Sequence, residues 1–189
     1  PDILPWHQWL ERFWQENFGL LDADMPQLLL SDFQERTLWE EVIRAADSEP
    51  LLQVPAAARS AREAWQLLHA WKLSIPRSQE SASEDVSAFA RWAKAYGQRC
   101  AAGNWLDSAR LPDAVRNAMA TGRLAPRMDA QVSREAGRQE RPPPRGLIVA
   151  GFDELTPQQE ALLDAVRAAG ATVTLLAPVD RTARVARVG

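Results

Sequence analysis

Two of the adjacent acidic pairs in the sequence are candidates for binding a divalent cation or activating a water molecule. Asp153 and Glu154 follow an apolar run, where a predicted strand passes into a helix start. Glu84 and Asp85 lie in a Ser/Glu-rich stretch at the beginning of another predicted helix. Negative charge at a helix N-terminus complements the helix dipole, which explains the second pair without any catalysis. The first pair raises the question whether its surroundings are a nucleotide site, the remains of one, or an ordinary strand, turn and helix.

The sequence contains no P-loop. Such a loop needs the pattern G-x-x-x-x-G-K-[ST], so that backbone N–H groups and a Lys can hold phosphates, and no Gly-Lys pair occurs among the 189 residues. We therefore expect no ATP binding by these residues alone and no cofactor. His7 and His69 have no companion ligands, so no metal site is expected. Cys100 has no nucleophile motif around it and is expected to be a small buried residue.

Composition limits the possible partners and compartment. The net charge is −3 and the pI is about 5.5, which argues against the whole chain being an autonomous nucleic-acid binder. One cysteine, no apolar run of membrane-spanning length and no signal peptide favour a cytoplasmic protein without a membrane partner. The chain begins at Pro1 without Met and ends at Gly189 after an Arg-rich stretch, so we expect a piece of a longer protein.

The first two thirds of the chain predict about five helices. Trp6, Trp9 and Trp14 fall on one helical face together with Leu10 and Phe13. A capping box formed by Ser31 and Gln34 begins the second helix, which should bury Trp39, Val42, Ile43 and Ala46. Three further helices are expected at about residues 56–72, 84–101 and 111–121.

The composition changes after residue 122. Residues 123–145 hold few large apolar side chains, many charges and three consecutive prolines, as in a linker or exposed loop. Leu147, Ile148 and Val149 then form an apolar run that suits a strand buried on both faces. A helix start at Thr156 and a second apolar run at 172–178 complete a βαβ unit with parallel strands. The expected fold class is mostly α with a small α/β part.

Tryptophans and arginines are the two candidate means of holding nucleic acid. Most tryptophans lie on apolar helical faces, so core packing is favoured over base stacking for Trp6, Trp9, Trp14, Trp39, Trp65 and Trp71. Trp92 and Trp105 are less clearly placed, and Trp105 is expected to be the most exposed. Arginines gather in two groups, for which the alternative reading is a solvated linker. The DNA-binding candidates are Arg134, Arg138, Arg141 and Arg145, then Arg181, Arg184 and Arg187.

The stretch "LIVAGFDELTPQQEALLDAVRAAGATVTLLA" resembles the Walker B segment of superfamily I DNA helicases. It is more similar to the equivalent segment of AddB-like proteins and of bacterial RecB-family nucleases described as inactivated superfamily I helicases. There the strand also runs into Gly-Phe and then into a Thr-Pro-Gln helix start. The helical stretches "LLLSDFQERTLWEEVIRAA", "AREAWQLLHAWKL" and "FARWAKAYGQRCAAGNWLD" resemble the helical insertion of that family. The resemblance covers most of residues 1–180.

This resemblance implies a degenerate Walker B site without catalytic residues. Ala150 lies at the position of the Asp that binds Mg²⁺, and Gly151 lies at the position of the Glu that orients the attacking water. Neither residue has a side-chain oxygen. The implied function is that of a non-catalytic fragment of a DNA repair protein. Its inactivated helicase-like module would support or position DNA for a RecB-family exonuclease domain outside the sequence.

The implied partners are DNA, bound weakly, the remaining domains of the parent chain and a helicase-nuclease partner subunit. The expected organisation is a helical domain over 1–125, a linker or loop over 126–145, the βαβ part of an incomplete P-loop-helicase-like core over 146–178, and an Arg-rich tail over 179–189. The alternative function is a helical protein–protein interaction domain without a DNA role. A working ATPase with a P-loop upstream is disfavoured by the residues at the Walker B positions.

Overall fold

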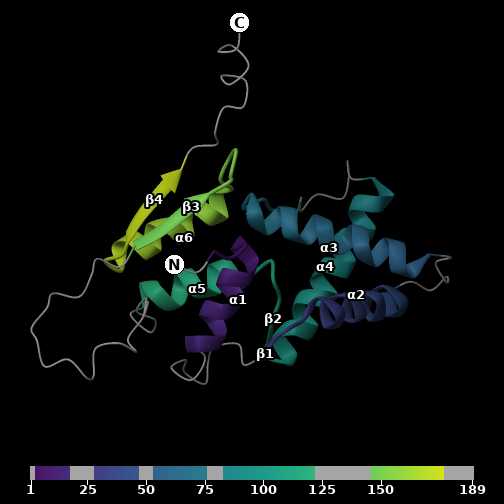
Figure 1. The fold of residues 1–189 in the computed structure, drawn as a ribbon. Helices are drawn as coiled ribbons and strands as arrows, with labels where there is room; N and C mark the ends of the chain where they lie inside the picture. Colours follow the sequence, from purple (N-terminus) through teal and green to yellow (C-terminus); the bar gives the residue numbers. More distant parts are fainter. Residues whose placement is uncertain (1–2, 18–27, 47–52, 76–82, 122–145, 177–189) are drawn as a thin grey trace, which may run out of the picture.

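The computed structural model describes residues 3–17, 28–46, 53–75, 83–121 and 146–176. The fold is mostly α with a small α/β part (Figure 1). The helices are α1 (Trp6–Asn17), α2 (Asp32–Ala46), α3 (Val54–Ala70), α4 (Glu84–Ala102), α5 (Leu111–Ala120) and α6 (Pro157–Ala168). The strands are β1 (Leu28–Leu29), β2 (Trp105–Leu106), β3 (Gly146–Ala150) and β4 (Thr172–Leu176). No helix in these ranges is both long and apolar enough to cross a membrane.

Side-chain caps define where several helices begin. Ser31 and Gln34 form the expected capping box of α2: the Gln34 side chain accepts a hydrogen bond from the Ser31 N–H at 2.9 Å, and Ser31 Oγ accepts one from the Gln34 N–H at 3.4 Å. Thr156 and Gln159 form the same arrangement before α6, where Pro157 occupies the first turn. The helix starts that the sequence predicted at these two places are confirmed.

The α/β part is a two-stranded parallel sheet with α6 as its connection. Leu147 pairs with Val173 and Val149 with Leu175, as expected for a βαβ unit. A second parallel pair, β1 with β2, joins segments 77 residues apart and was not expected from the sequence, because two-residue strands carry no periodicity.

The expectation that β3 is buried on both faces is wrong. Val149 is 7% exposed and Leu147 is half-buried, and both contribute to the packed face of the sheet. Ile148 points to the opposite face, as the alternation of a strand requires, and it is 67% exposed. Its neighbour on that face, Leu176, is 51% exposed. None of the described elements covers this second face.

The first hydrophobic cluster combines the sheet with helices from the beginning and the middle of the chain. Leu10 and Trp14 from α1, Val115 from α5, and Leu162 and Val166 from α6 are all nearly inaccessible to solvent. Leu147 and Val173 pack against this cluster from the two strands. Thus α1 and α5 belong to the same core as the βαβ unit (Figure 1).

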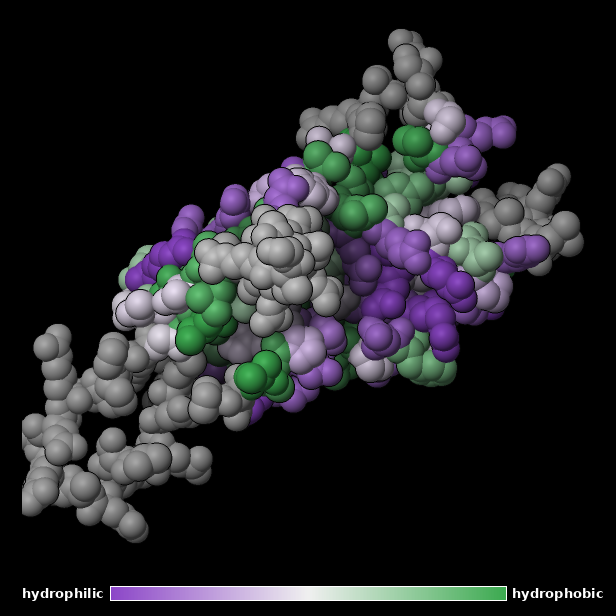
Figure 2. All heavy atoms as spheres, turned by 45° about the horizontal axis from the view of Figure 1, so that its top comes forward, coloured by the Kyte–Doolittle hydropathy of each residue, from purple (hydrophilic) through white to green (hydrophobic). Residues whose placement is uncertain are grey.

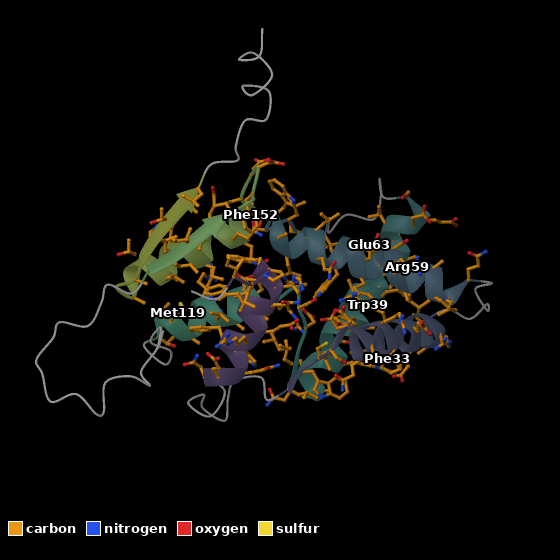
Figure 3. All side chains as sticks on the ribbon, in the orientation of Figure 1. Phe33, Trp39, Arg59, Glu63, Met119 and Phe152 are labelled. Atoms are coloured by element: carbon orange, nitrogen blue, oxygen red, sulfur yellow. The ribbon has the colours of Figure 1, made fainter. Side chains whose placement is uncertain are left out.

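The second hydrophobic cluster is formed by α2, α3 and α4. Trp39 and Tyr96 are fully buried, and their rings stack at 4.0 Å with an interplanar angle of 9° (Figure 3). Trp65 packs edge-on against both rings, and Ile43 and Ala61 fill the space around them. On the outside, the visible face carries separate hydrophobic patches between hydrophilic residues (Figure 2).

Candidate functional site

The candidate site lies where β3 ends and the chain turns toward α6. Ala150 is the last residue of β3 and pairs with Leu176, the last residue of β4, so both strands end at one edge of the sheet. Gly151 follows with φ +83°, a left-handed conformation that glycine adopts without a steric cost. In open α/β sheets, ligands bind at the carboxyl ends of the strands. Ala150 and Gly151, the two positions singled out in the sequence, thus lie at the end of β3 and directly after it.

The end of β3 has few side chains that could bind a metal ion or activate a water molecule. Ala150 and Gly151 are exposed and offer no side-chain oxygen to a metal ion or a water molecule. Asp153 and Glu154 are also exposed and lie on the turn rather than on the strand. Among the described residues, no group of three or more His, Cys, Asp or Glu side chains could hold a metal ion. The end of β3 therefore lacks the carboxylates that phosphoryl transfer would need.

Phe152 fixes this turn to the rest of the molecule. Its half-buried ring meets the Trp6 ring edge-on, with centroids 5.9 Å apart and an interplanar angle of 80° (Figure 3). Trp6 in turn contacts Trp9 at 5.5 Å, and Trp9 contacts Phe13 at 5.9 Å along α1. A row of four aromatic rings thus runs from the strand end along one helix. The edge-to-face contact between Phe152 and Trp6 thus helps to hold the turn against α1.

The arginines predicted to bind DNA all lie outside the described residues. They are Arg134, Arg138, Arg141, Arg145, Arg181, Arg184 and Arg187. Within the described residues, surface arginines form ion pairs on their own helices, such as Arg12 with Glu16 at 2.6 Å and Arg167 with Asp164 at 2.7 Å. DNA binding by the two Arg groups stays a prediction.

The tryptophans are distributed largely as predicted, with two exceptions. Trp14 and Trp39 are 1% and 0% exposed. Trp71 is 41% exposed because it lies after the last turn of α3, where the helix has passed beyond the second cluster. Trp105, expected to be the most exposed, is half-buried because it pairs with Leu28 in the unexpected β1–β2 ladder and packs against the second cluster.

Two buried carboxylates form a polar junction between the two clusters, and sequence reasoning missed both. Glu35 on α2 is 2% exposed. Its two oxygens accept hydrogen bonds from the Ser108 N–H at 2.6 Å and from Arg62 Nε at 2.7 Å. Burial raises the pKa of Glu35 despite these hydrogen bonds. Helical spacing could have indicated this burial, because Glu35 lies four residues before Trp39 and seven before Val42 on the same face of α2, but it could not have identified the partners of Glu35.

Asp107 is the second carboxylate of the junction and is 1% exposed. It accepts hydrogen bonds from Trp65 Nε1 at 3.2 Å and from the backbone N–H and Nε of Arg110, both at 2.9 Å. From the other side, Gln158 Nε2 donates to the Ala109 carbonyl at 2.8 Å. The segment between β2 and α5 is therefore held by α3 and by α6, which fixes the turn at the strand end relative to the helices.

Cys100 and His69 are structural residues of the second cluster and its border. Cys100 is fully buried, as predicted, and burial raises the pKa of its thiol. His69 packs edge-on against Trp65 at 4.4 Å, and desolvation lowers its pKa. Neither has the accessible, activated environment of a nucleophile or general base.

Comparison with known proteins supplies no relative: no family model, no curated protein sequence and no solved structure matches this chain. The geometry described above is therefore the basis for any functional assignment.

Proposed function

We propose that this chain is a non-catalytic part of a DNA repair protein of the AddB-like or RecB-family nuclease type. In this proposal its helicase-like module has lost ATP hydrolysis and supports or positions DNA for a nuclease domain elsewhere, in the cytoplasm. One observation carries the proposal. The β3 strand, the Gly151-Phe152 turn and the capped α6 helix follow one another in the order expected of a Walker B segment, and in this proposal Ala150 and Gly151 stand in the places of its two acidic residues.

The remaining geometry agrees with loss of catalysis. A magnesium site at this edge would need a carboxylate at the end of β3. The nearest acids, Asp153 and Glu154, are on the turn, and Asp153 follows the Phe152 ring that anchors the turn to α1. The chain therefore contributes a shaped scaffold rather than a reaction centre.

The test is DNA binding by the full chain. Fluorescence anisotropy with a labelled single-stranded oligonucleotide should detect weak binding at low salt that falls as salt rises, because each phosphate contact releases counterions. Two variants would replace one Arg group each with alanine: Arg134, Arg138, Arg141 and Arg145 in the first, and Arg181, Arg184 and Arg187 in the second. Each lost phosphate contact should reduce the salt slope by about one.

A control variant replaces cations that already form surface ion pairs, namely Arg12, Arg44 and Arg167. It should bind like the parent chain. Absence of binding at low salt would reject the DNA role. Tight binding that does not respond to salt and survives both Arg variants would reject the electrostatic account in favour of aromatic stacking.

A second candidate function, a protein-interaction domain, has one specific observation in its favour. Large apolar side chains are exposed at several places on the described surface, including Leu67 at 58%, Trp71 at 41% and Leu73 at 62% around the end of α3. Soluble domains commonly bury such groups in contacts with other proteins.

A further inference from the structure

An open groove of about 510 Å³ lies between α3 and α4. Trp65 on α3 and Ile75, just beyond its end, form one wall. The floor consists of small residues on one side of α4: Ala90, Gly97 and Ala101. These residues span eleven positions, which in a helix is about 16 Å, or three turns. The groove therefore has the length of a three-turn helix.

The lining of this groove is almost entirely apolar. Small side chains on the floor allow the backbone of a bound element to approach α4 closely, whereas the Trp65 and Ile75 side chains can pack against its side. Lys94 and Gln98 are the polar residues that border it. A nucleic-acid strand would need cations and hydrogen-bond donors along the floor, so the chemistry fits the apolar face of an amphipathic helix better.

Gly97 has no role inside the molecule that requires glycine. It lies within α4, and its φ is not among the positive values found in the described residues. A Cβ built at this position would have no heavy atom within 4 Å. Glycine inside a helix costs about 0.5–1 kcal/mol relative to alanine. Neither backbone conformation nor internal packing explains the residue, whereas close approach of an external backbone would.

The charge beside the groove specifies the partner further. After Asp85, α4 carries Arg91, Lys94 and Arg99 and no acidic residue, and among these cations Arg99 pairs with Glu41 of α2 at 3.0 Å. Lys94 borders the groove and is exposed. The described residues that line the groove include no acid. An acidic side chain on a bound helix would therefore meet the complementary charge of Lys94.

We propose that the α3–α4 groove binds an amphipathic helix of a protein partner, with its apolar face toward Gly97 and with acidic residues beside Lys94. This inference is independent of the DNA role, because the groove shares no residue with the strand end or with the predicted Arg groups. It gives the protein-interaction candidate a defined surface and a defined class of ligand.

The test uses the full chain and a displayed library of helical peptides with random surface residues. Peptides selected by the parent chain should be amphipathic and enriched in Asp and Glu along one edge of the apolar face. The variant Gly97→Leu fills the groove, and because its surroundings are open and leucine favours helix, the fold should not lose stability. It should weaken binding of the selected peptides at least tenfold, whereas Ala56→Leu, on the exposed side of the first turn of α3, should not.

Charge reversal provides the second test. Lys94→Glu should weaken the acidic peptides severalfold and reduce the dependence of their affinity on salt, whereas Arg59→Glu, an equal change on the exposed surface of α3 (Figure 3), should leave them nearly unchanged. Three results would overturn the proposal: no peptide is selected, the selected peptides are basic, or Gly97→Leu leaves their affinity intact. Binding of an oligo-dT probe that Gly97→Leu abolishes would assign the groove to nucleic acid instead.

Discussion

The two hydrophobic clusters differ in how completely each one is enclosed. In the second cluster, three helices surround Trp39 and Tyr96, which are fully buried. In the first cluster, the helices cover only one side of the β3–β4 sheet, and Ile148 remains 67% exposed on the other. A helix satisfies its backbone hydrogen bonds internally, but a two-stranded sheet has two open edges and needs further elements on its faces. The three helices of the second cluster can thus enclose their core by themselves, whereas the two-stranded sheet leaves one of its faces uncovered.

The strongest test of this difference is the replacement of Trp39 with alanine. Its side chain is inaccessible to solvent and stacks on Tyr96, so the change leaves a large cavity among three helices that cannot collapse together. Such truncations cost about 3–5 kcal/mol, which is much of the stability of an ordinary domain. Urea unfolding followed by circular dichroism should show a large decrease in the midpoint. A small decrease would mean that the second cluster is loosely packed.

The polar junction between the clusters should give the next largest effect. Glu35→Ala removes the acceptor for Arg62 Nε and for the Ser108 N–H, and Arg62 keeps only its ion pair with the exposed Asp32. Removing a buried carboxylate that accepts these hydrogen bonds should cost about 2–3 kcal/mol. The matched control is Glu41→Ala, which breaks the exposed pair with Arg99 and should cost at most about 1 kcal/mol. Equal costs for the two variants would contradict a structural role for the junction.

These two residues also show what the sequence can and cannot predict. The burial of Trp39 followed from helical periodicity, and the start of α2 followed from the Ser31–Gln34 capping box, because both signals are local. The burial of Glu35 depends on Ser108, which is 73 residues away in the sequence. No local pattern encodes such a pairing, nor that of the two-residue strands β1 and β2.

At the end of β3, too, local features could be predicted from the sequence and features that depend on distant residues could not. Ala150 and Gly151 were correctly placed where β3 ends, and the parallel pairing with residues 172–176 was predicted from the order of strand, helix and strand. The exposure of Ile148 was not predicted, because an apolar run indicates only that a strand can be buried on both faces. Which faces are covered depends on elements elsewhere.

A smaller change in stability is expected at the C-terminal end of α3, which lies beside the β3–α6 connection (Figure 1). Lys72 has φ +52°, and the Leu73 N–H bonds the Leu68 carbonyl at 2.8 Å, as in a Schellman motif. Glycine adopts this conformation without strain, so Lys72→Gly should stabilise the chain by about 1 kcal/mol. Thermal unfolding should shift upward by about 2–4 °C. Arg59→Gly, inside the same helix, should instead destabilise it by about 1 kcal/mol, and a loss of stability in Lys72→Gly would contradict the strained cap.

The smallest change in the free energy of unfolding is expected on the uncovered face of the β3–β4 sheet. Aspartate substitutions at two adjacent positions of β3 test this expectation. Val149→Asp places a charge on the packed face of the sheet, where Val149 is 7% exposed, and should cost several kcal/mol because burial there penalises an unpaired charge. Ile148→Asp, one position earlier, places the same charge on the exposed face. Its cost should stay within about 1 kcal/mol, most of which reflects the low strand propensity of aspartate.

Chemical unfolding of both variants at several protein concentrations separates the two faces. Side chains alternate along a strand. The two variants therefore introduce the same residue into the same strand at adjacent positions and differ in which face of the sheet carries the charge. A cost for Ile148→Asp as large as that for Val149→Asp would show that the second face is covered in solution. If that cost appeared only at high protein concentration, another copy of the chain would be the cover. A small cost at all concentrations would establish that these residues leave one face of the sheet bare, in contrast to the enclosed helical cluster.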